Sequence, residues 1–193
     1  MKLLRLLTLL SLLALAGCAT VTKVERGEAV VAERLVVHLD GPWNQFEGGA
    51  AGGAPTWTVE GFTVDRLQFY VGIKDGAVIA QAPRGDKEQR PLTFRASMEP
   101  HEIVALYQNL LTADGSTFTL DRLEPAEFLG GKGFRFHFSM VRKVDEVRLS
   151  GIAYGAVRGN ELFVIMYSAP RLAFFPRYQS QIEAMARSAR LRS

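Results

Sequence analysis

The chain has 193 residues, of which 48% are hydrophobic, with 23 basic side chains, 20 acidic ones and a single cysteine. This length and composition suit one globular domain with a sizeable core. The near balance of charge excludes the concentrated basic surface that nucleic-acid binding requires. The lone cysteine excludes an internal disulfide and any zinc site built on paired cysteines.

Residues 1–17 have the three-part layout of a secretory signal peptide. Lys2 and Arg5 are basic, residues 6–16 are apolar, and small residues precede Cys18. The apolar run is shorter than the roughly 20 residues that a membrane-spanning helix needs. We therefore predict export and removal of this segment, which leaves 176 residues with 21 basic and 20 acidic side chains.

The four residues Leu15-Ala16-Gly17-Cys18 resemble the lipobox of bacterial lipoproteins. The resemblance implies cleavage before Cys18, a diacylglyceryl group on its sulfur and a further acyl chain, such as palmitate, on its amino group. Two or more chains anchor a protein stably, whereas one holds it only marginally. Ala19 in place of aspartate favours the outer membrane, with the protein facing the periplasm. The alternative is an ordinary signal peptide with a cysteine nearby.

The N-terminal part of the exported chain is predicted as a tether followed by a strand. Residues 18–29 are polar and mixed, so they are expected to link the lipid to a single domain over residues 30–193. Residues 30–39 are rich in valine and leucine and predict a first strand, which contains His38. Asp40-Gly41-Pro42 ends this strand.

Two tryptophans flank a glycine-rich stretch at residues 47–55. Glycine loses more backbone entropy on ordering than any other residue, so we predict a flexible loop. The stretch lacks the lysine of a phosphate-binding loop. Because tryptophan is enriched where binding energy concentrates, Trp43, Phe46 and Trp57 are a candidate binding surface. The alternative is that both tryptophans belong to the core.

The middle of the chain predicts a hairpin and a helix. Residues 64–73 alternate apolar and polar side chains, Asp75-Gly76 suits a tight turn, and residues 77–80 are expected to return as the partner strand. Residues 97–111 carry an apolar stripe at helical spacing and a proline in the first turn.

The second half of the chain predicts four strands and a helix. The strands are residues 118–123, 134–140, 147–157 and 162–167, and Pro125 is expected to close the first of them. Residues 174–190 predict a helix that packs on the sheet. Its expected buried stripe is Phe175, Tyr178, Ile182, Met185 and Ala189.

Consecutive strands joined by hairpins predict an α+β fold in which helices flank an antiparallel sheet, an α/β/α sandwich in one domain. A helix ends near Leu111, strands follow through Gly130-Gly131-Lys132-Gly133-Phe134, and residues 161–165 lead into the last helix. Over residues 35–190 this layout resembles the Mog1/PsbP-like fold. The resemblance implies a protein that binds other proteins, and it assigns a role to no residue.

The sequence gives only weak signs of a catalytic or metal-binding site. There is no G-x-S-x-G motif, and His38, His101 and His137 are too widely spaced for a metal motif, so we predict no metal and no cofactor. The favoured hypothesis is a lipid-anchored binding or assembly module with a protein partner in the envelope. One alternative is an enzyme using His38, Asp40 and His137, which requires strands 30–39 and 134–140 to pair. Another is a carrier of a small apolar ligand, in a cavity lined by some of the 12 phenylalanines.

Overall fold

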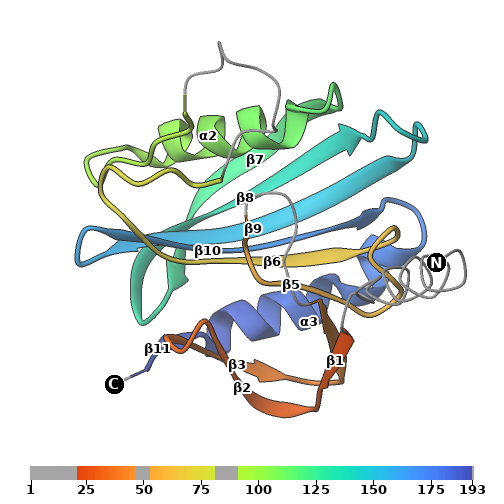
Figure 1. The fold of residues 1–193 in the computed structure, drawn as a ribbon, viewed down its shortest axis with the longest axis horizontal. Coiled ribbons are helices and arrows are strands. Elements are labelled where there is room, and N and C mark those ends of the chain that lie inside the picture. Colours follow the sequence, from red (N-terminus) through yellow and green to blue (C-terminus); the bar gives the residue numbers. More distant parts are fainter. Residues whose placement is uncertain (1–20, 47–52, 81–90, 193) are drawn as a thin grey trace, which may run out of the picture.

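The computed structural model describes residues 21–46, 53–80 and 91–192 (Figure 1). An eight-stranded antiparallel sheet in the order β1-β4-β5-β6-β10-β9-β8-β7 forms the middle layer, and a smaller sheet has the order β11-β3-β2. The strands are β1 Val21–Val24, β2 Gly27–Val31, β3 Leu35–Leu39, β4 Trp43–Phe46, β5 Thr56–Thr58, β6 Arg66–Lys74, β7 Thr117–Phe128, β8 Gly131–Val141, β9 Arg148–Arg158, β10 Glu161–Pro170 and β11 Arg190–Leu191. The helices are α2 Pro100–Thr112 and α3 Phe174–Ser188.

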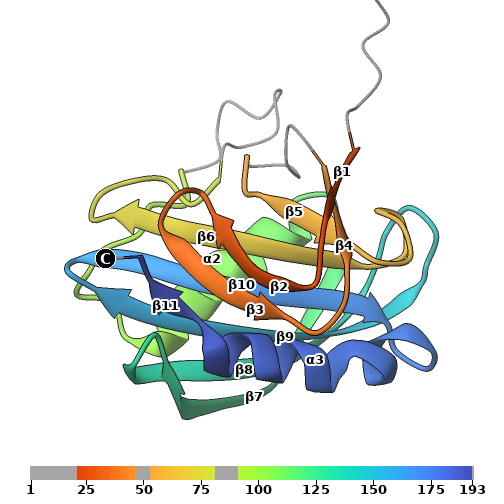
Figure 2. The ribbon, with the colours of Figure 1, turned by 90° about the horizontal axis from the view of Figure 1, so that it is seen from below.

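The large sheet is covered on both faces. Helix α2 lies on one face, and α3 lies on the other together with the small sheet (Figures 1 and 2). The antiparallel sheet with two helices in one domain matches the predicted fold class, but the second covering layer is part helix and part sheet. Two separate apolar clusters fill the spaces on either side of the large sheet.

Helix α2 begins at Pro100, because Glu99 forms a capping box with Glu102 and proline is tolerated in the first turn. It buries Ile103, Val104 and Tyr107 against the sheet. Helix α3 buries the stripe that its spacing predicts, which confirms that it docks on the domain. The buried residues of α3 are Phe175, Tyr178, Ile182, Met185 and Ala186.

Glycines on β9 make room for the phenylalanine rings of β8. Phe138 is paired with Gly151, and Phe134 with Gly155. A Cβ at either glycine would overlap the paired ring, so each ring lies over bare backbone. This arrangement lets the alternating aromatic row of β8 lie close to the sheet beneath α2, as the period-two pattern predicts.

The N-terminal predictions need two corrections. Residues 30–39 form parts of two strands, because Ala32 and Glu33 adopt positive φ angles of 47° and 59° and turn the chain between β2 and β3. Strand β1 lies inside the segment predicted as a tether and pairs with β4, so Val21–Val24 belong to the large sheet. The sequence did not predict β1 because it is an exposed edge strand with polar residues, which lacks the apolar pattern of a buried strand.

Two strand predictions in the middle of the chain are also wrong. The turn at Asp75-Gly76 forms, but residues 77–80 contribute only an isolated bridge between Val78 and Thr93, and β6 pairs with β5 and β10 instead. Strand β7 continues through Pro125 to Phe128. Proline is tolerated there because β7 is the edge of the sheet, where one side of the strand needs no backbone donor.

Candidate functional site

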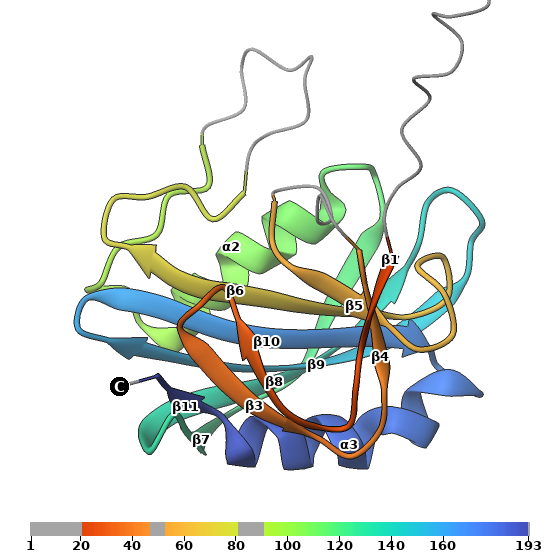
Figure 3. The same cartoon turned by 60° about the horizontal axis from the view of Figure 1, so that its bottom comes forward.

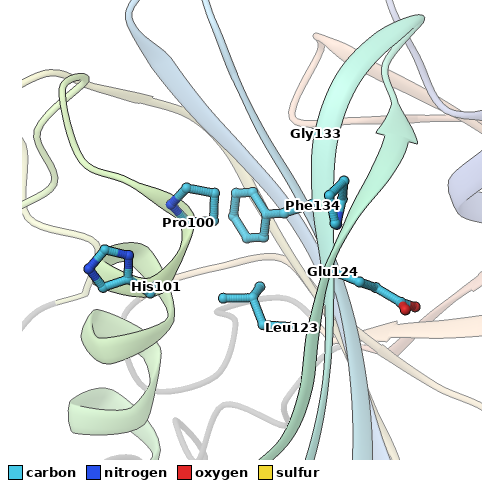
Figure 4. Close-up of a pocket in the computed structure, with 7 residues that line it drawn as sticks. Pro100, His101, Leu123, Glu124, Gly133 and Phe134 are labelled. Atoms are coloured by element: carbon cyan, nitrogen blue, oxygen red, sulfur yellow. The ribbon is translucent and has the colours of Figure 1, made fainter.

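A surface pocket of about 290 Å³ lies between the start of α2 and the β7–β8 hairpin. Leu123, Pro125 and Phe134 form its floor, because alternation places them on the α2 face of the sheet. In Figure 4, Pro100 of the first turn of α2 faces the Phe134 ring, whereas the ring of the neighbouring His101 points away from it. The volume lies just below the roughly 300–1,000 Å³ of small-molecule sites, so it suits one apolar side chain or ring.

Gly133, which lines the pocket, packs closely against the backbone of β9. A Cβ at this position would lie 2.5 Å from the carbonyl oxygen of Gly155, so no other residue fits without moving the strand. Phe134 is 4% exposed and is the part of the aromatic row that reaches the pocket. Phe136 and Phe138 are fully buried beneath α2, so the phenylalanine row expected to line a ligand cavity is filled core instead.

The opposite face of the same hairpin carries a polar cluster, which we define as Arg122, Glu124, Arg135, His137 and Tyr154. Glu124 borders the pocket, but its carboxylate points to this other face (Figure 4). The cross-strand register sets Tyr154 beside Arg135 and Arg135 beside Glu124, with His137 opposite Arg122. The cluster therefore follows directly from the pairing of β7, β8 and β9.

Arg135 is the hub of the polar cluster. Its Nε donates to Glu124 Oε1 at 2.8 Å, its Nη2 donates to the same oxygen, and its Nη1 donates to the Tyr154 hydroxyl at 3.3 Å. The hydrogen bond from Arg135 lowers the pKa of Glu124. Burial, and next the positive charge of Arg135, lower the pKa of His137, so its imidazole is neutral near pH 7. The Arg135 guanidinium therefore forms its hydrogen bonds within the chain.

The predicted catalytic group is not assembled by strand pairing. His38 and Asp40 approach each other, with Nε2 and Oδ1 4.0 Å apart, and both side chains are about half exposed. Among the described strands, however, β3 pairs with β2 and β11, whereas His137 is on β8. The charged groups that act on the pKa of His137 are Arg135, Glu124, Arg122 and Glu183. The pairing on which the enzyme hypothesis depended is therefore wrong.

The two tryptophans of the predicted binding surface are core residues. Trp43 is 1% exposed and Trp57 is 2% exposed, and both lie in the cluster beneath α3. Trp43 meets the edge of Tyr167 at a centroid distance of 6.2 Å, and Trp57 meets Phe69 at 4.6 Å. Phe46 is half-buried, so the prediction of an exposed tryptophan surface is wrong, and the core alternative holds.

Other sequence predictions fall outside the described residues. Cys18, the lipobox and residues 47–52 of the glycine-rich stretch belong to this group. Within residues 21–46, 53–80 and 91–192, no helix combines the length and apolar character needed to cross a bilayer. Within the same ranges, no three or more histidine, cysteine, aspartate or glutamate side chains gather as a metal site would require.

Comparisons with known proteins identify the fold. No family model matches the chain, and no curated protein matches it in sequence. The solution structure of cyanobacterial PsbP (CyanoP) from Synechocystis sp. PCC 6803 is similar, with a TM-score of 0.53 and 10% sequence identity, over 92% of this chain and 95% of that protein. The chain therefore has a PsbP-like fold. At 10% sequence identity the similarity shows the fold alone and assigns no function.

Proposed function

We propose that this chain is a lipid-anchored accessory protein of the bacterial cell envelope, tethered through Cys18 to the outer membrane and facing the periplasm. It binds a protein partner at the pocket between α2 and β7. The observation that carries the binding role is the apolar pocket itself, which opens on the surface of a domain whose other aromatic rows are packed as core.

The anchor is supported by the lipobox match and by the position of the first strand. Only Ala19 and Thr20 separate Cys18 from Val21, the first residue of β1, so the domain follows the modified cysteine almost at once. Mass spectrometry of the mature N-terminus should find a diacylglyceryl and an acyl group on Cys18. The Cys18→Ala protein should remain unprocessed or leave the membrane. A mature chain that starts elsewhere and carries no lipid would refute the anchor.

The pocket recognises an apolar side chain of the partner. Its floor is formed by Leu123, Pro125 and Phe134, and the first turn of α2 borders it with Pro100 and His101. Addition of a partner strand along β7 is disfavoured, because a bulge lies between Leu120 and Arg122 and Pro125 lacks an N–H group. The partner is therefore held mainly by side-chain contacts in the pocket rather than by a continued sheet.

A pair of substitutions on β7 tests the pocket. Pro125 is exposed and lines the pocket, so Pro125→Glu sets a charge at its mouth while leaving the core intact. Thr119→Glu is the matched control, because Thr119 is exposed on the same strand and lies outside the pocket. Burying an unpaired charge in a partner's interface should weaken binding by more than about tenfold.

Cross-linking in whole cells, followed by capture of the lipoprotein, provides the measurement. The partner retained by wild type and Thr119→Glu should be lost from Pro125→Glu. Equal retention by both variants, with unchanged melting temperatures, would exclude the pocket as the binding site.

A further inference from the structure

One end of the large sheet carries the two most exposed large apolar side chains of the described residues. Leu172 is 92% exposed and Val144 is 83% exposed, whereas the other exposed apolar side chains do not exceed 49%. Figures 1 and 3 place the connections at residues 59–65, 142–147 and 171–173 at the same end of the long axis. We call this region the three-loop end.

Hydrogen bonds between its loops hold the three-loop end together. Arg142 Nη1 donates to the carbonyl of Thr63 at 2.7 Å, while its Nε and Nη2 bind the Asp145 carboxylate. The backbone N–H of Arg171 donates to the carbonyl of Arg148 at 3.0 Å. The tips that carry Val144 and Leu172 are therefore fixed in place and presented outward.

Cationic side chains adjoin both apolar tips. Lys143 precedes Val144, Arg171 precedes Leu172, and both cations are exposed. The acidic groups Asp114, Asp145 and Glu146 are also exposed at this end, so the surface carries charges of both signs. An apolar tip with a cation directly before it in the chain matches a phospholipid surface, where the apolar group enters the acyl boundary and the cation meets the phosphate.

The chain also enters the domain near this end. Val21 pairs with Phe46, the Phe46 ring lies 5.1 Å from the Phe62 ring, and Phe62 belongs to the 59–65 loop. The three-residue step from Cys18 to Val21 spans at most about 11 Å when fully extended. A lipid on Cys18 would therefore hold the first strand close to the bilayer.

From these observations we infer that the domain rests on the membrane with its three-loop end, inserting Val144 and Leu172 at the headgroup boundary. This orientation rests on the proposed anchor at Cys18. The three-loop end thus contacts the phospholipid bilayer. The alternative is that this end binds a protein partner, and the experiment below distinguishes the two.

The lone cysteine makes the test direct, because lipidation blocks the Cys18 sulfur and a new cysteine is then the one free thiol. Val144→Cys, Leu172→Cys and the control Val78→Cys are labelled with an environment-sensitive dye in the full lipidated protein. Val78 is 43% exposed and follows β6 at the opposite end of the long axis (Figure 1). Each protein is reconstituted in vesicles of phosphatidylethanolamine and phosphatidylglycerol.

Labels at positions 144 and 172 should shift to shorter wavelength and brighten on the vesicles, while the label at 78 stays unchanged. Equal emission at the three positions in vesicle-bound protein overturns the orientation but leaves the anchor standing. Release of the protein from the vesicles with an unmodified Cys18 overturns the anchor, and the orientation with it.

Charge reversal supplies a second measurement. Lys143→Glu combined with Arg171→Glu should remove most of the emission shift at position 144. The same change of charge at the far end, Lys74→Glu with Arg95→Glu, should leave the shift intact, because both of those side chains are exposed at the end of the sheet that carries Val78. An equal loss in both double variants would contradict the proposed contact.

Discussion

Two glycines of β9 allow a quantitative test of how the domain packs. Gly151 lies beneath Phe138, and Gly155 lies beneath Phe134. Phe138 is fully buried and stacks on Phe118 at a centroid distance of 5.1 Å, so its ring has nowhere to move. Phe134 borders the 290 Å³ pocket, so its ring can turn into open space. The same substitution should therefore have different costs at the two sites.

For Gly151→Ala, overpacking of a filled core costs about 1–3 kcal/mol. Replacing glycine inside a strand returns about 0.5–1 kcal/mol, because alanine has less backbone entropy to lose. The net loss of unfolding free energy is roughly 1–2 kcal/mol, which corresponds to a decrease in melting temperature of roughly 2–8 °C for a domain of this size. For Gly155→Ala the loss should stay below about 1 kcal/mol, because Phe134 moves into the pocket.

Thermal and urea unfolding of residues 19–193 measure both variants. Gly41→Ala is the control, because nothing lies within 4 Å of a Cβ there and its φ angle is unexceptional, so the change should be neutral or slightly stabilising. A Gly155→Ala protein that is destabilised as much as Gly151→Ala, or more, would refute the argument that the pocket relieves the strain.

Three further predictions concern α3, the polar cluster and the loop before β6. Ile182→Ala should lower the unfolding free energy by about 2–5 kcal/mol, because Ile182 is fully buried. As a control, Arg187→Ala should change it by less than about 0.5 kcal/mol, because Arg187 is exposed. Equal melting temperatures for the two variants would contradict docking of α3. The folded pKa of His137 lies below its ordinary 6.5, so the unfolded chain binds more protons near pH 6 and stability should fall as the pH drops below about 6.5. His137→Gln should flatten the melting temperature between pH 7.5 and 5, and an unchanged slope would exclude His137 as the cause. Asp65→Asn should lower the free energy of unfolding in urea by about 1.5–3 kcal/mol. The buried Asp65 carboxylate accepts hydrogen bonds from the Thr58 hydroxyl and from the backbone N–H groups of residues 59 and 60. Stability equal to that of the wild type would contradict this role.

The parts of the fold that the sequence predicts are those determined by local periodicity and turn chemistry. The stripe of α3 repeats at helical spacing, and the row from Phe134 to Met140 alternates with a period of two. Gly159 and Asn160 adopt φ angles of 55° and 64°, as a tight hairpin between β9 and β10 requires. In each case the residues that determine the structure lie within a few positions of one another.

The predictions that fail depend on contacts between distant segments. Strand β6 ends in a turn that suits a hairpin, but it pairs with β5 and with β10. Strand β10 comes nearly ninety residues later, and this pairing buries Phe69 and Tyr167 under α3. Trp43 and Trp57 illustrate the same limit, since a large aromatic side chain serves a core and an interface equally well. The pocket joins residues 100–101, 123–125 and 133–134, whose proximity exists only once α2 packs on β7.

The two proposed surfaces lie at opposite ends of α2, which allows them to act together. The C-terminal end of α2 leads to Gly115, which adjoins the Lys143 side chain at the three-loop end. The N-terminal end of α2 forms the rim of the pocket. A helix of 13 residues is about 20 Å long, so a domain that rests on the bilayer by its three-loop end holds the pocket well clear of the headgroups. A tether of three residues could otherwise press any face against the membrane. The apolar tips that fix the orientation are therefore what would leave the pocket open to a partner in the periplasm.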